Sequence, residues 1–366
     1  MKRRQFIRNV GLSVAGVTTI ASPAIAQDVR KWRLLHAYPK GYPIYGTAPE
    51  RFAEFVTRAS GGRLVVDVFG AGEVVPAFET MDAVRGGTAQ AGFGTSYFWK
   101  GKVPALQFIT GLPFGMTAQE QNAWFASGGL ELAQKAYYEL NVKFFVAGNS
   151  GPQMGGWFNK EINSATDLAG IKMRMPGLGG ETLSALGTTI VNLPGGELLP
   201  SMQSGAIDAV EWIGPYLDLA FGFHKVAEYY YYPGWQEPSG INDLFVNQDE
   251  WNALPEDLQE IVAAGASMAN SYVLDQLTAN NPEALRVLVE DNGVKLKRFS
   301  DETLIELGKA AGTLLNDKAS GDPLSREILD SILKFRTTAL KQTDISTRAV
   351  LDARALDFQY AQLAAE

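Results

Sequence analysis

Residues 72–76 read GEVVP and residues 196–200 read GELLP, and each segment is followed by a predicted helix and a second glycine-led stretch. That stretch is GTAQA at 87–91 and GAIDA at 205–209. The two predicted helices differ in length by six residues, which is too irregular for a solenoid repeat. We interpret this internal repeat as a sign of two similar α/β lobes. The alternative is a chance match of common turn and helix-start signals.

Short apolar strands alternate with amphipathic helices on both sides of these segments. RLVVDVF at 63–69 and KFFVAG at 143–148 are predicted strands, and helices are predicted over 46–59 and about 118–140. After the strand INDLFVN at 241–247 the chain is mostly long helix to its end. This alternation indicates an α/β fold whose layers are built on largely parallel sheets.

The internal repeat also predicts where a ligand would bind. If the lobes are equivalent, the strand leading to residues 94–97 in the first lobe corresponds to the strand leading to Glu211 and Trp212 in the second. Ligands of open α/β sheets lie beyond the carboxyl ends of the strands. We therefore expect both segments to face one cleft between the lobes.

The N-terminus has the pattern of an export signal. Basic residues precede the apolar stretch Val10–Ile20, and Ala24–Ala26 forms an A-x-A cleavage site. A transmembrane anchor needs about 20 apolar residues, and this stretch is shorter. Residues 1–26 are therefore predicted to be a signal peptide for export to the periplasm. Arg3–Ile7 resembles a twin-arginine signal, although Lys2 stands where Ser or Thr is commoner.

Composition excludes several classes of function. Removal of residues 1–26 would shift the net charge from −8 to about −12, and an acidic protein is a poor partner for nucleic acid. The chain has no cysteine and only two histidines, His36 and His224, so thiolate chemistry and a multi-histidine zinc site are excluded. Gly177–Gly180 imitates part of a dinucleotide fingerprint, but Thr182 stands where its last glycine would be.

Arg174 is a candidate for binding an acid. Strand alternation in IKMRM places it opposite the apolar face formed by Ile171, Met173 and Met175. A guanidinium matches a carboxylate with two parallel hydrogen bonds, which a lysine cannot reproduce. The alternative is that Arg174 lies on a solvated face.

Four further side chains are candidates, each with an ordinary alternative. The Gln153 amide oxygen suits a hard cation, or it lies on a polar rim. Glu211 ends a predicted buried strand, where a carboxylate needs a cation, a metal or a salt bridge to lysine. Trp212 and Trp235 could form walls of a pocket or belong to the core.

Several separated blocks of sequence together carry a family resemblance. GNSGPQMGGWFNKEIN at 148–163, LAGIKMRMPGLGGE at 168–181, the block at 193–216 and YYYYPGW at 229–235 occur in order. They resemble the solute-binding subunits of TRAP transporters, the DctP family. The similarity is closest to the TakP-like type, which binds α-keto acids and lactate.

The resemblance implies a fold and a division of the chain. The fold is a two-lobed α/β periplasmic binding protein with a ligand cleft between the lobes, a long connecting helix and a helical C-terminal tail. Lobe I would comprise residues 27–148 with about 239–252, and lobe II residues 149–238. Residues 253–366 would form the connecting helix and the C-terminal region.

The resemblance also implies a role for each of a set of residues. Arg174 would clamp the ligand carboxylate, and a sodium or calcium ion would bridge ligand and protein. The residues implied to bind substrate are Arg174, Gln153, Asn149, Tyr97, Trp212 and Trp235. The residues implied to bind the metal are Gln153, Glu211, Trp212 through its carbonyl, and Glu237.

The resulting expectation is capture, not catalysis. The chain would bind a 2-oxo or 2-hydroxy monocarboxylate, such as pyruvate or lactate, and deliver it to the TRAP membrane subunits; a homodimer through the C-terminal helix is possible. One alternative is a binding protein for another organic or sugar acid without a metal. A different class is a metal-assisted lyase with Glu211 as base, but no positioned acid and base pair accompanies that carboxylate.

Overall fold

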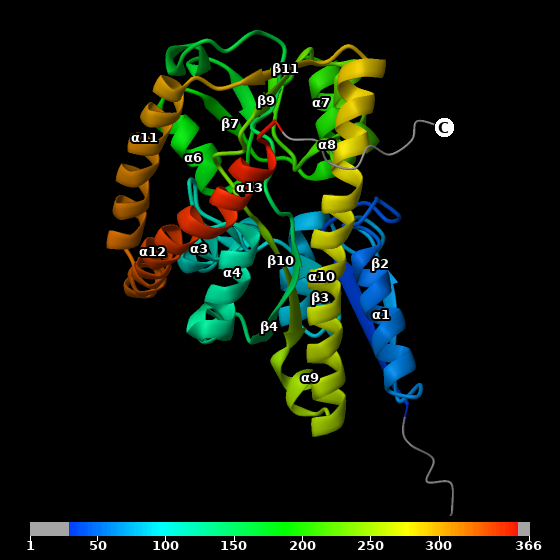
Figure 1. Ribbon diagram of the computed structural model, residues 1–366. Coiled ribbons are helices and arrows are strands. Elements are labelled where there is room, and N and C mark those ends of the chain that lie inside the picture. The colour runs from blue at the N-terminus through cyan, green and yellow to red at the C-terminus, as the bar shows by residue number, and fades with distance from the viewer. Residues whose placement is uncertain (1–28, 358–366) are drawn as a thin grey trace, which may run out of the picture.

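The computed structural model describes residues 29–357. The predicted signal peptide at 1–26 lies outside the described residues. Two sheets with their helices form two lobes, one above the other in Figure 1. The expected two-lobed α/β architecture is therefore confirmed. Within residues 29–357, no helix combines the length and the hydropathy that a membrane span requires.

The sheet of lobe I has five strands in the order β2-β1-β3-β10-β4. The first three strands run parallel, and β10 is antiparallel to both of its neighbours. Apolar side chains fill both faces of this sheet. The strands are β1 (Arg30–His36), β2 (Leu64–Phe69), β3 (Ala91–Gly94), β4 (Val142–Asn149) and β10 (Ile241–Asn247).

The sheet of lobe II has six strands in the order β11-β9-β5-β8-β6-β7. Its strands are short, each two to four residues long. The strands are β5 (Gly156–Phe158), β6 (Lys172–Arg174), β7 (Thr189–Val191), β8 (Ala209–Val210), β9 (Tyr229–Tyr232) and β11 (Lys295–Arg298).

The two sheets repeat one pattern of strand pairing. In lobe I the pairs β2–β1 and β1–β3 are parallel, and the pairs β3–β10 and β10–β4 are antiparallel. In lobe II the pairs β7–β6 and β6–β8 are parallel, and the pairs β8–β5 and β5–β9 are antiparallel. Strand β3 therefore corresponds to β8. This is the equivalence that the internal repeat of GEVVP and GELLP predicts.

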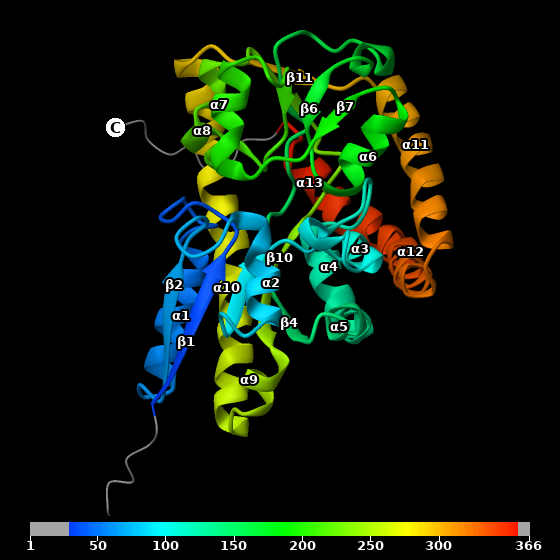
Figure 2. The same cartoon turned by 180° about the vertical axis from the view of Figure 1, so that it is seen from behind.

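Helices cover both sheets and connect them (Figures 1 and 2). Helices α1 to α5 and α9 belong to lobe I, and α6 to α8 belong to lobe II. Their bounds are α1 (Ala48–Ala59), α2 (Thr80–Arg85), α3 (Gln107–Thr110), α4 (Ala118–Trp124), α5 (Leu130–Tyr138), α6 (Gly177–Ala185), α7 (Leu198–Gln203), α8 (Pro215–Phe221) and α9 (Gln248–Asn252).

Helix α10 (Glu256–Arg286) joins the lobes along one side of the molecule. It packs against α1 and β4 in lobe I and against α8 in lobe II. Gly265 brings it close to lobe I, since a Cβ there would lie 3.0 Å from the ring of Phe52. At 31 residues and about 1.5 Å per residue, the helix is long enough to span both lobes.

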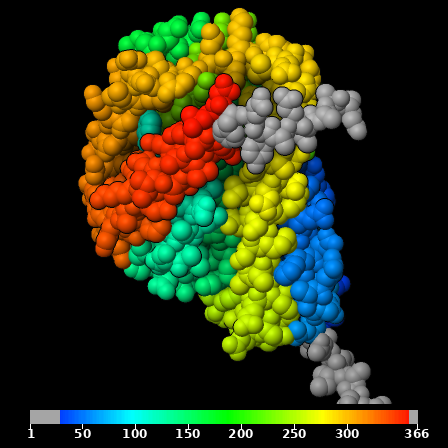
Figure 3. Space-filling model, in the orientation of Figure 1, coloured from blue at the N-terminus to red at the C-terminus, as the bar shows by residue number. Residues whose placement is uncertain are grey.

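The C-terminal region crosses back over the two lobes. Helix α11 (Asp301–Ser320) packs on α6 in lobe II, and α12 (Pro323–Thr343) packs on α3, α4 and α5 in lobe I. Helix α13 (Ala349–Arg354) continues this line across the face shown in Figure 3. One element differs from the expected run of helices: β11 extends the sheet of lobe II by pairing in parallel with β9.

Candidate functional site

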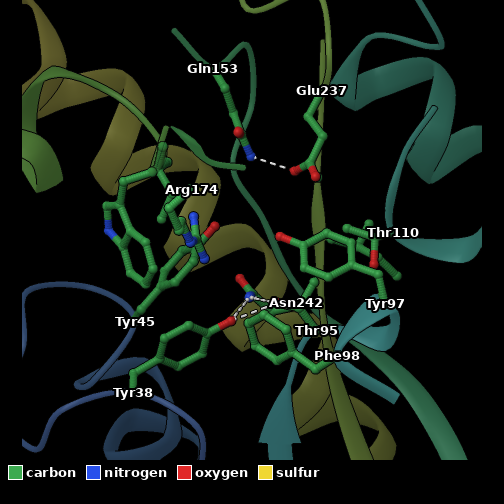
Figure 4. A pocket seen from close by; sticks show the side chains of 14 residues that line it. Tyr38, Tyr45, Thr95, Tyr97, Phe98, Thr110, Gln153, Arg174, Glu237 and Asn242 are labelled. Atoms are coloured by element: carbon green, nitrogen blue, oxygen red, sulfur yellow. Dashed lines mark hydrogen bonds between the residues drawn. The ribbon is translucent and has the colours of Figure 1, made fainter. Parts of the chain in front are cut away.

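A cavity lies between the two lobes, where the carboxyl ends of β3, β6 and β8 meet (Figure 4). The space between protein atoms there is about 310 Å³, including part that is open to solvent. Both lobes contribute side chains, as the paired-strand argument predicts. The lining residues are Tyr38, Tyr45, Thr95, Tyr97, Phe98, Thr110, Gln153, Arg174, Trp212, Ile213, Glu237, Gly240, Ile241 and Asn242.

Arg174 ends β6 and enters the cavity from lobe II. Its side chain is 2% exposed, so it does not lie on a solvated face. Its Nη1 donates to the carbonyl oxygen of Glu211 at 2.6 Å, and its Nε donates to the carbonyl of Leu193 at 3.3 Å. Among the described residues Nη2 has no hydrogen-bond partner. The guanidinium is therefore fixed in place with one nitrogen left for a ligand.

Trp212 forms the wall beside this guanidinium. The Arg174 Cζ lies 5.0 Å from the centroid of its ring, within the range of a cation–π contact. The indole Nε1 donates to the hydroxyl of Tyr42 at 3.1 Å, and that hydroxyl donates to the carbonyl of Leu217 at 2.6 Å. Because Tyr42 belongs to lobe I, these two bonds connect the lobes next to the cavity.

Gln153 and Glu237 meet at the upper end of the cavity in Figure 4. The Gln153 Nε2 donates to the Glu237 carboxylate at 2.7 Å and to the Ser150 hydroxyl at 3.2 Å. The Gln153 Oε1 is buried and has no hydrogen-bond partner within the described chain. A buried amide oxygen without a donor costs free energy, so this atom needs a ligand that carries positive charge or a proton.

Glu211 follows β8 and lies beside Arg174. One carboxylate oxygen is 3.7 Å from Arg174 Nη1, and the other accepts from Gln236 Nε2 at 3.4 Å. Burial raises the pKa of Glu211 well above its usual value, and the nearby charge of Glu237 adds to this rise. Burial likewise raises the pKa of Glu237 to about 7, although the Gln153 hydrogen bond and Arg174 oppose the shift.

The donor set fits a hard cation. Nowhere in residues 29–357 do three or more His, Cys, Asp or Glu side chains gather as a metal site, so any ion here would use mixed oxygen ligands. The Trp212 carbonyl oxygen, like the Gln153 Oε1, lacks a donor among the described residues. With the carboxylates of Glu211 and Glu237 these are the oxygen types that sodium and calcium prefer.

Three other predicted residues have different positions. Tyr97 lines the cavity from the turn Ser96–Trp99 that follows β3. Asn149 lies beneath the Gln153 loop, where its Oδ1 accepts from the Gly151 backbone at 2.9 Å, and it is not a lining residue. Trp235 is 3% exposed and stacks on Phe114 in the core, and it is not a lining residue.

Apart from Tyr97, sequence reasoning missed the wall that lobe I contributes. This wall includes Tyr38 after β1, Thr95 after β3 and Asn242 in β10. One signal could have indicated it: in INDLFVN, Asn242 and Asp243 interrupt an otherwise apolar strand. Adjacent polar residues in a buried strand need partners or a ligand.

Comparisons with known proteins agree with this geometry. Residues 34–321 match the family model DctP, described as bacterial extracellular solute-binding protein, family 7. A monocarboxylate 2-oxoacid-binding periplasmic protein of Nostoc sp. is 41% identical over 344 residues, which cover 92% of this chain and 94% of that relative.

Two solved structures are also similar. A TRAP periplasmic solute-binding protein of Pseudoalteromonas atlantica with bound sodium and pyruvate has a TM-score of 0.86 and 39% identity, covering 90% of this chain and 100% of that one. One from Bordetella bronchiseptica, a dimer with calcium and picolinate, has a TM-score of 0.87 and 36% identity, covering 89% and 97%. The chain thus belongs to the DctP family of TRAP transporter solute-binding proteins.

Proposed function

We propose that this protein captures a small 2-oxo or 2-hydroxy monocarboxylate, such as pyruvate or lactate, together with a sodium or calcium ion, and delivers the acid to its membrane permease. The observation that carries the proposal is the charge of the cavity. Arg174, Glu211 and Glu237 are each at least nine-tenths buried. When all three are ionised, two negative charges face one positive charge.

Charge balance explains why an acid would need a cation. An incoming carboxylate adds a second uncompensated negative charge to a buried site, which is strongly unfavourable. A sodium ion would offset one of these charges and a calcium ion both. Such an ion, when bound, supplies the positive charge that lets an acid lie next to two glutamates.

The residues of the cavity divide into two roles under this proposal. Arg174 Nη2 would bind the carboxylate of the acid. The Gln153 Oε1, the carboxylates of Glu211 and Glu237 and the Trp212 carbonyl would hold the cation, and Tyr97 would contact the acid. The cavity is narrow, because the space open to the centre of a water molecule is about 20 Å³, little more than one water needs, and this favours a small acid over a sugar acid.

Calorimetry with pyruvate tests this assignment. Arg174→Ala should weaken binding roughly 100-fold or more, as expected when one partner of a buried charge pair is removed. The matched control is Lys172→Ala, because Lys172 is exposed on the same strand and should bind like the wild type. Chelator-treated protein in sodium-free buffer should bind weakly, and calcium should restore affinity. Unchanged binding by Arg174→Ala would show that the site is wrongly assigned.

The limits of the lobes also remain a proposal. Lobe I would comprise residues 27–148 with about 239–252, and lobe II residues 149–238. The described strands from 30 to 149 and from 241 to 247 form one sheet, which supports these limits. Strand β11 adds a piece of the C-terminal region to lobe II.

A homodimer through the C-terminal helices is a further part of the proposal. Apolar side chains around α13 are exposed, including Ile345 at 81% and Val350 at 63%. Light scattering after gel filtration would test it, with Ile345→Glu/Val350→Glu expected to yield a monomer if this face is the interface. A wild-type protein that is monomeric at micromolar concentration would contradict it.

The export route is proposed from sequence alone. Arg3 and Arg4 would direct the precursor to the twin-arginine pathway. Replacing both with lysine should leave the precursor uncleaved inside the cell, whereas Lys2→Ala should not.

A further inference from the structure

We propose that Tyr38, Thr95 and Asn242, here called the lobe I donor cluster, donate a hydrogen bond to the same carboxylate that Arg174 holds from lobe II. The inference rests on the proposed function, because it assumes that the cavity binds an acid. It adds a second contact for that acid on the opposite lobe, so that the carboxylate itself would join the lobes.

The cluster is a buried set of three polar side chains on the cavity wall (Figure 4). Asn242 Nδ2 donates to the Tyr38 hydroxyl at 2.7 Å and to the Thr95 hydroxyl at 3.3 Å. The two hydroxyl oxygens are 2.6 Å apart, so one of them donates to the other. All three residues are at most 4% exposed.

Counting protons shows that the cluster has donors to spare. The two hydroxyl oxygens are 2.6 Å apart and lie 2.7 and 3.3 Å from Asn242 Nδ2, so one amide hydrogen faces both of them and the second is not used by this pair. Tyr38 and Thr95 carry one hydroxyl hydrogen each, and the bond between them uses one of the two. The other has no acceptor among the described residues. Whichever hydroxyl keeps it, the cluster presents one hydroxyl donor to the cavity beside the Asn242 amide.

The backbone of β10 places the amide at this position. The pairing of β10 with β4 shifts register between Asn242 and Asp243, where Ala147 of β4 has no partner, and such irregularities re-aim side chains at functional sites. On the neighbouring strand Gly148 leaves room for the amide, since a Cβ there would lie 2.6 Å from Asn242 Oδ1. Two local features of the sheet therefore hold Asn242 against the two hydroxyls.

Arg174 leaves acceptor positions of a bound carboxylate unfilled. Two of its five N–H groups already bind backbone carbonyls, and even a two-bond fork from the remaining groups fills only two of the about four acceptor positions of a carboxylate. Hydrogen bonds to a charged acceptor are roughly twice as strong as neutral ones, which makes the carboxylate the favoured partner for the spare hydroxyl proton.

The proton count predicts that either hydroxyl alone is sufficient. In Tyr38→Phe the Thr95 hydroxyl still accepts from Asn242 and can donate to the ligand, and in Thr95→Val the Tyr38 hydroxyl does so. Removing both hydroxyls frees the Asn242 amide to donate in their place, so only a triple variant that also carries Asn242→Leu removes every donor. We expect each single hydroxyl variant to bind pyruvate within about threefold of the wild type, and the triple variant to bind roughly 10- to 100-fold more weakly.

Calorimetry and stopped-flow kinetics with pyruvate in calcium buffer test this prediction. Because the donor reaches the acid only when the lobes are closed, the loss should lie in a faster dissociation rate, with the association rate nearly unchanged. Tyr231→Phe is the matched control, since its buried hydroxyl bonds to the backbone of Ile162 outside the cavity. Thermal unfolding checks that each variant folds.

Two results would overturn the inference: a triple variant that binds like the wild type, or a single hydroxyl variant that loses as much as the triple. If the triple variant does not fold, Asn242→Asp replaces it. That carboxylate would accept both hydroxyl protons and leave none for the ligand, so unchanged affinity would overturn the inference too. If the wild type binds no monocarboxylate, the proposed function fails; if only the cluster variants bind normally, this inference fails alone.

Discussion

Glu237 shows how a single carboxyl group can link cation binding to pH. Its pKa is raised to about 7 by burial, against the effect of the Gln153 hydrogen bond and Arg174. Below about pH 7 it holds a proton at the place where the proposed cation would bind. Protons and the cation therefore compete for this carboxylate.

We expect the affinity for calcium to rise as the pH increases through about 7. Without a cation, stability changes with pH in the opposite direction. The unfolded chain releases this proton near pH 4.5, whereas the folded chain keeps it up to about pH 7. Stability therefore falls as the pH rises from about 4.5 to about 7. Calcium titrations at pH 5.5, 7 and 8.5 measure the first effect. Glu237→Gln should bind calcium weakly with a flatter pH profile. Equal affinity at all three pH values for the wild type would contradict this prediction.

Asp218 supports the segment that carries Glu211 and Trp212. Its carboxylate accepts from Trp157 Nε1 at 2.9 Å and from the Tyr230 hydroxyl at 2.7 Å. It also accepts from the Gly214 backbone at 3.1 Å and from the Ile213 backbone at 3.3 Å. From the first turn of α8 it therefore fixes the preceding chain that enters the cavity.

Asp218→Ala should destabilise the protein by about 3 kcal/mol, because it leaves several buried donors without an acceptor. Asp218→Asn should cost less, since an amide oxygen can still accept. Urea unfolding of both variants measures the difference, with the exposed Asp317→Ala as a surface control. A loss below about 1 kcal/mol for Asp218→Ala would show that these bonds contribute little.

At the scale of single residues, the sequence predicted the site residues that stand out by residue type and strand position, and it missed residues that only the folded sheet brings together. Arg174, Gln153 and Trp212 lie together at the cavity, and each was a candidate from its residue type and strand position. Tyr38 and Asn242 were not, because 204 positions separate them and only the folded sheet joins them. Trp235 was a candidate for the pocket wall but lies in the core, because sequence pattern cannot separate a buried core indole from one that lines a pocket.

At the scale of elements, α6 is held by ion pairs to two other parts of the chain. Glu181 on α6 contacts Lys100 of lobe I and Lys318 of α11. The glutamate is 21% exposed, so the pairs are partly screened by solvent. This trio joins lobe II to lobe I at the edge of the closed cleft.

Glu181→Gln should favour the open form modestly. Partly exposed pairs of this kind contribute up to about 1 kcal/mol, so pyruvate should dissociate roughly two- to fivefold faster. Raising the salt concentration should reduce the difference between variant and wild type. Stopped-flow measurement at low and high salt provides the test, with Glu327→Gln as a control because its pair with Lys135 joins α12 to α5 without lobe II. A salt-independent effect would point to a cause other than these ion pairs.

The sequence predicted which strands of the two sheets are equivalent, but it did not predict the strand that the C-terminal region adds to lobe II. The repeated glycine segments predicted that β3 and β8 are equivalent, and the pairing of both sheets agrees. Strand β11 was missed because KLKR at 295–298 is short and charged. Its partner β9 is more than 60 positions away, and strand formation there depends on that long-range pairing.

For the whole molecule, family membership places the chain in transport. A DctP protein is a solute-binding component that works with a TRAP membrane permease, so the expectation of a binding protein, not an enzyme, is confirmed. The structure has the closed arrangement such a component needs to carry a ligand, because Arg174 and Glu211 are each only 2% exposed. Release then requires the lobes to part.

Ligand and cation together should close the molecule in solution. The acid and the cation each bring a charge that the other offsets, so neither alone should stabilise the closed form as well as both. Small-angle scattering would show a smaller radius of gyration with pyruvate and calcium together than with either alone. Arg174→Ala should show no such decrease. A wild-type radius that does not respond to both would contradict the proposed coupling.

The bonds of Trp212 give the protein a built-in optical reporter. Of the seven tryptophans in the sequence, Trp212 is the one among the described lining residues of the cavity. Its indole is bonded to Tyr42 across the lobes and lies over Arg174. When the lobes separate, this ring loses its partner and meets water, so its fluorescence emission should shift to the red. Opening of the unlabelled protein could thus be followed in real time by its fluorescence. Trp212→Phe is the reference, because its emission should not respond to opening.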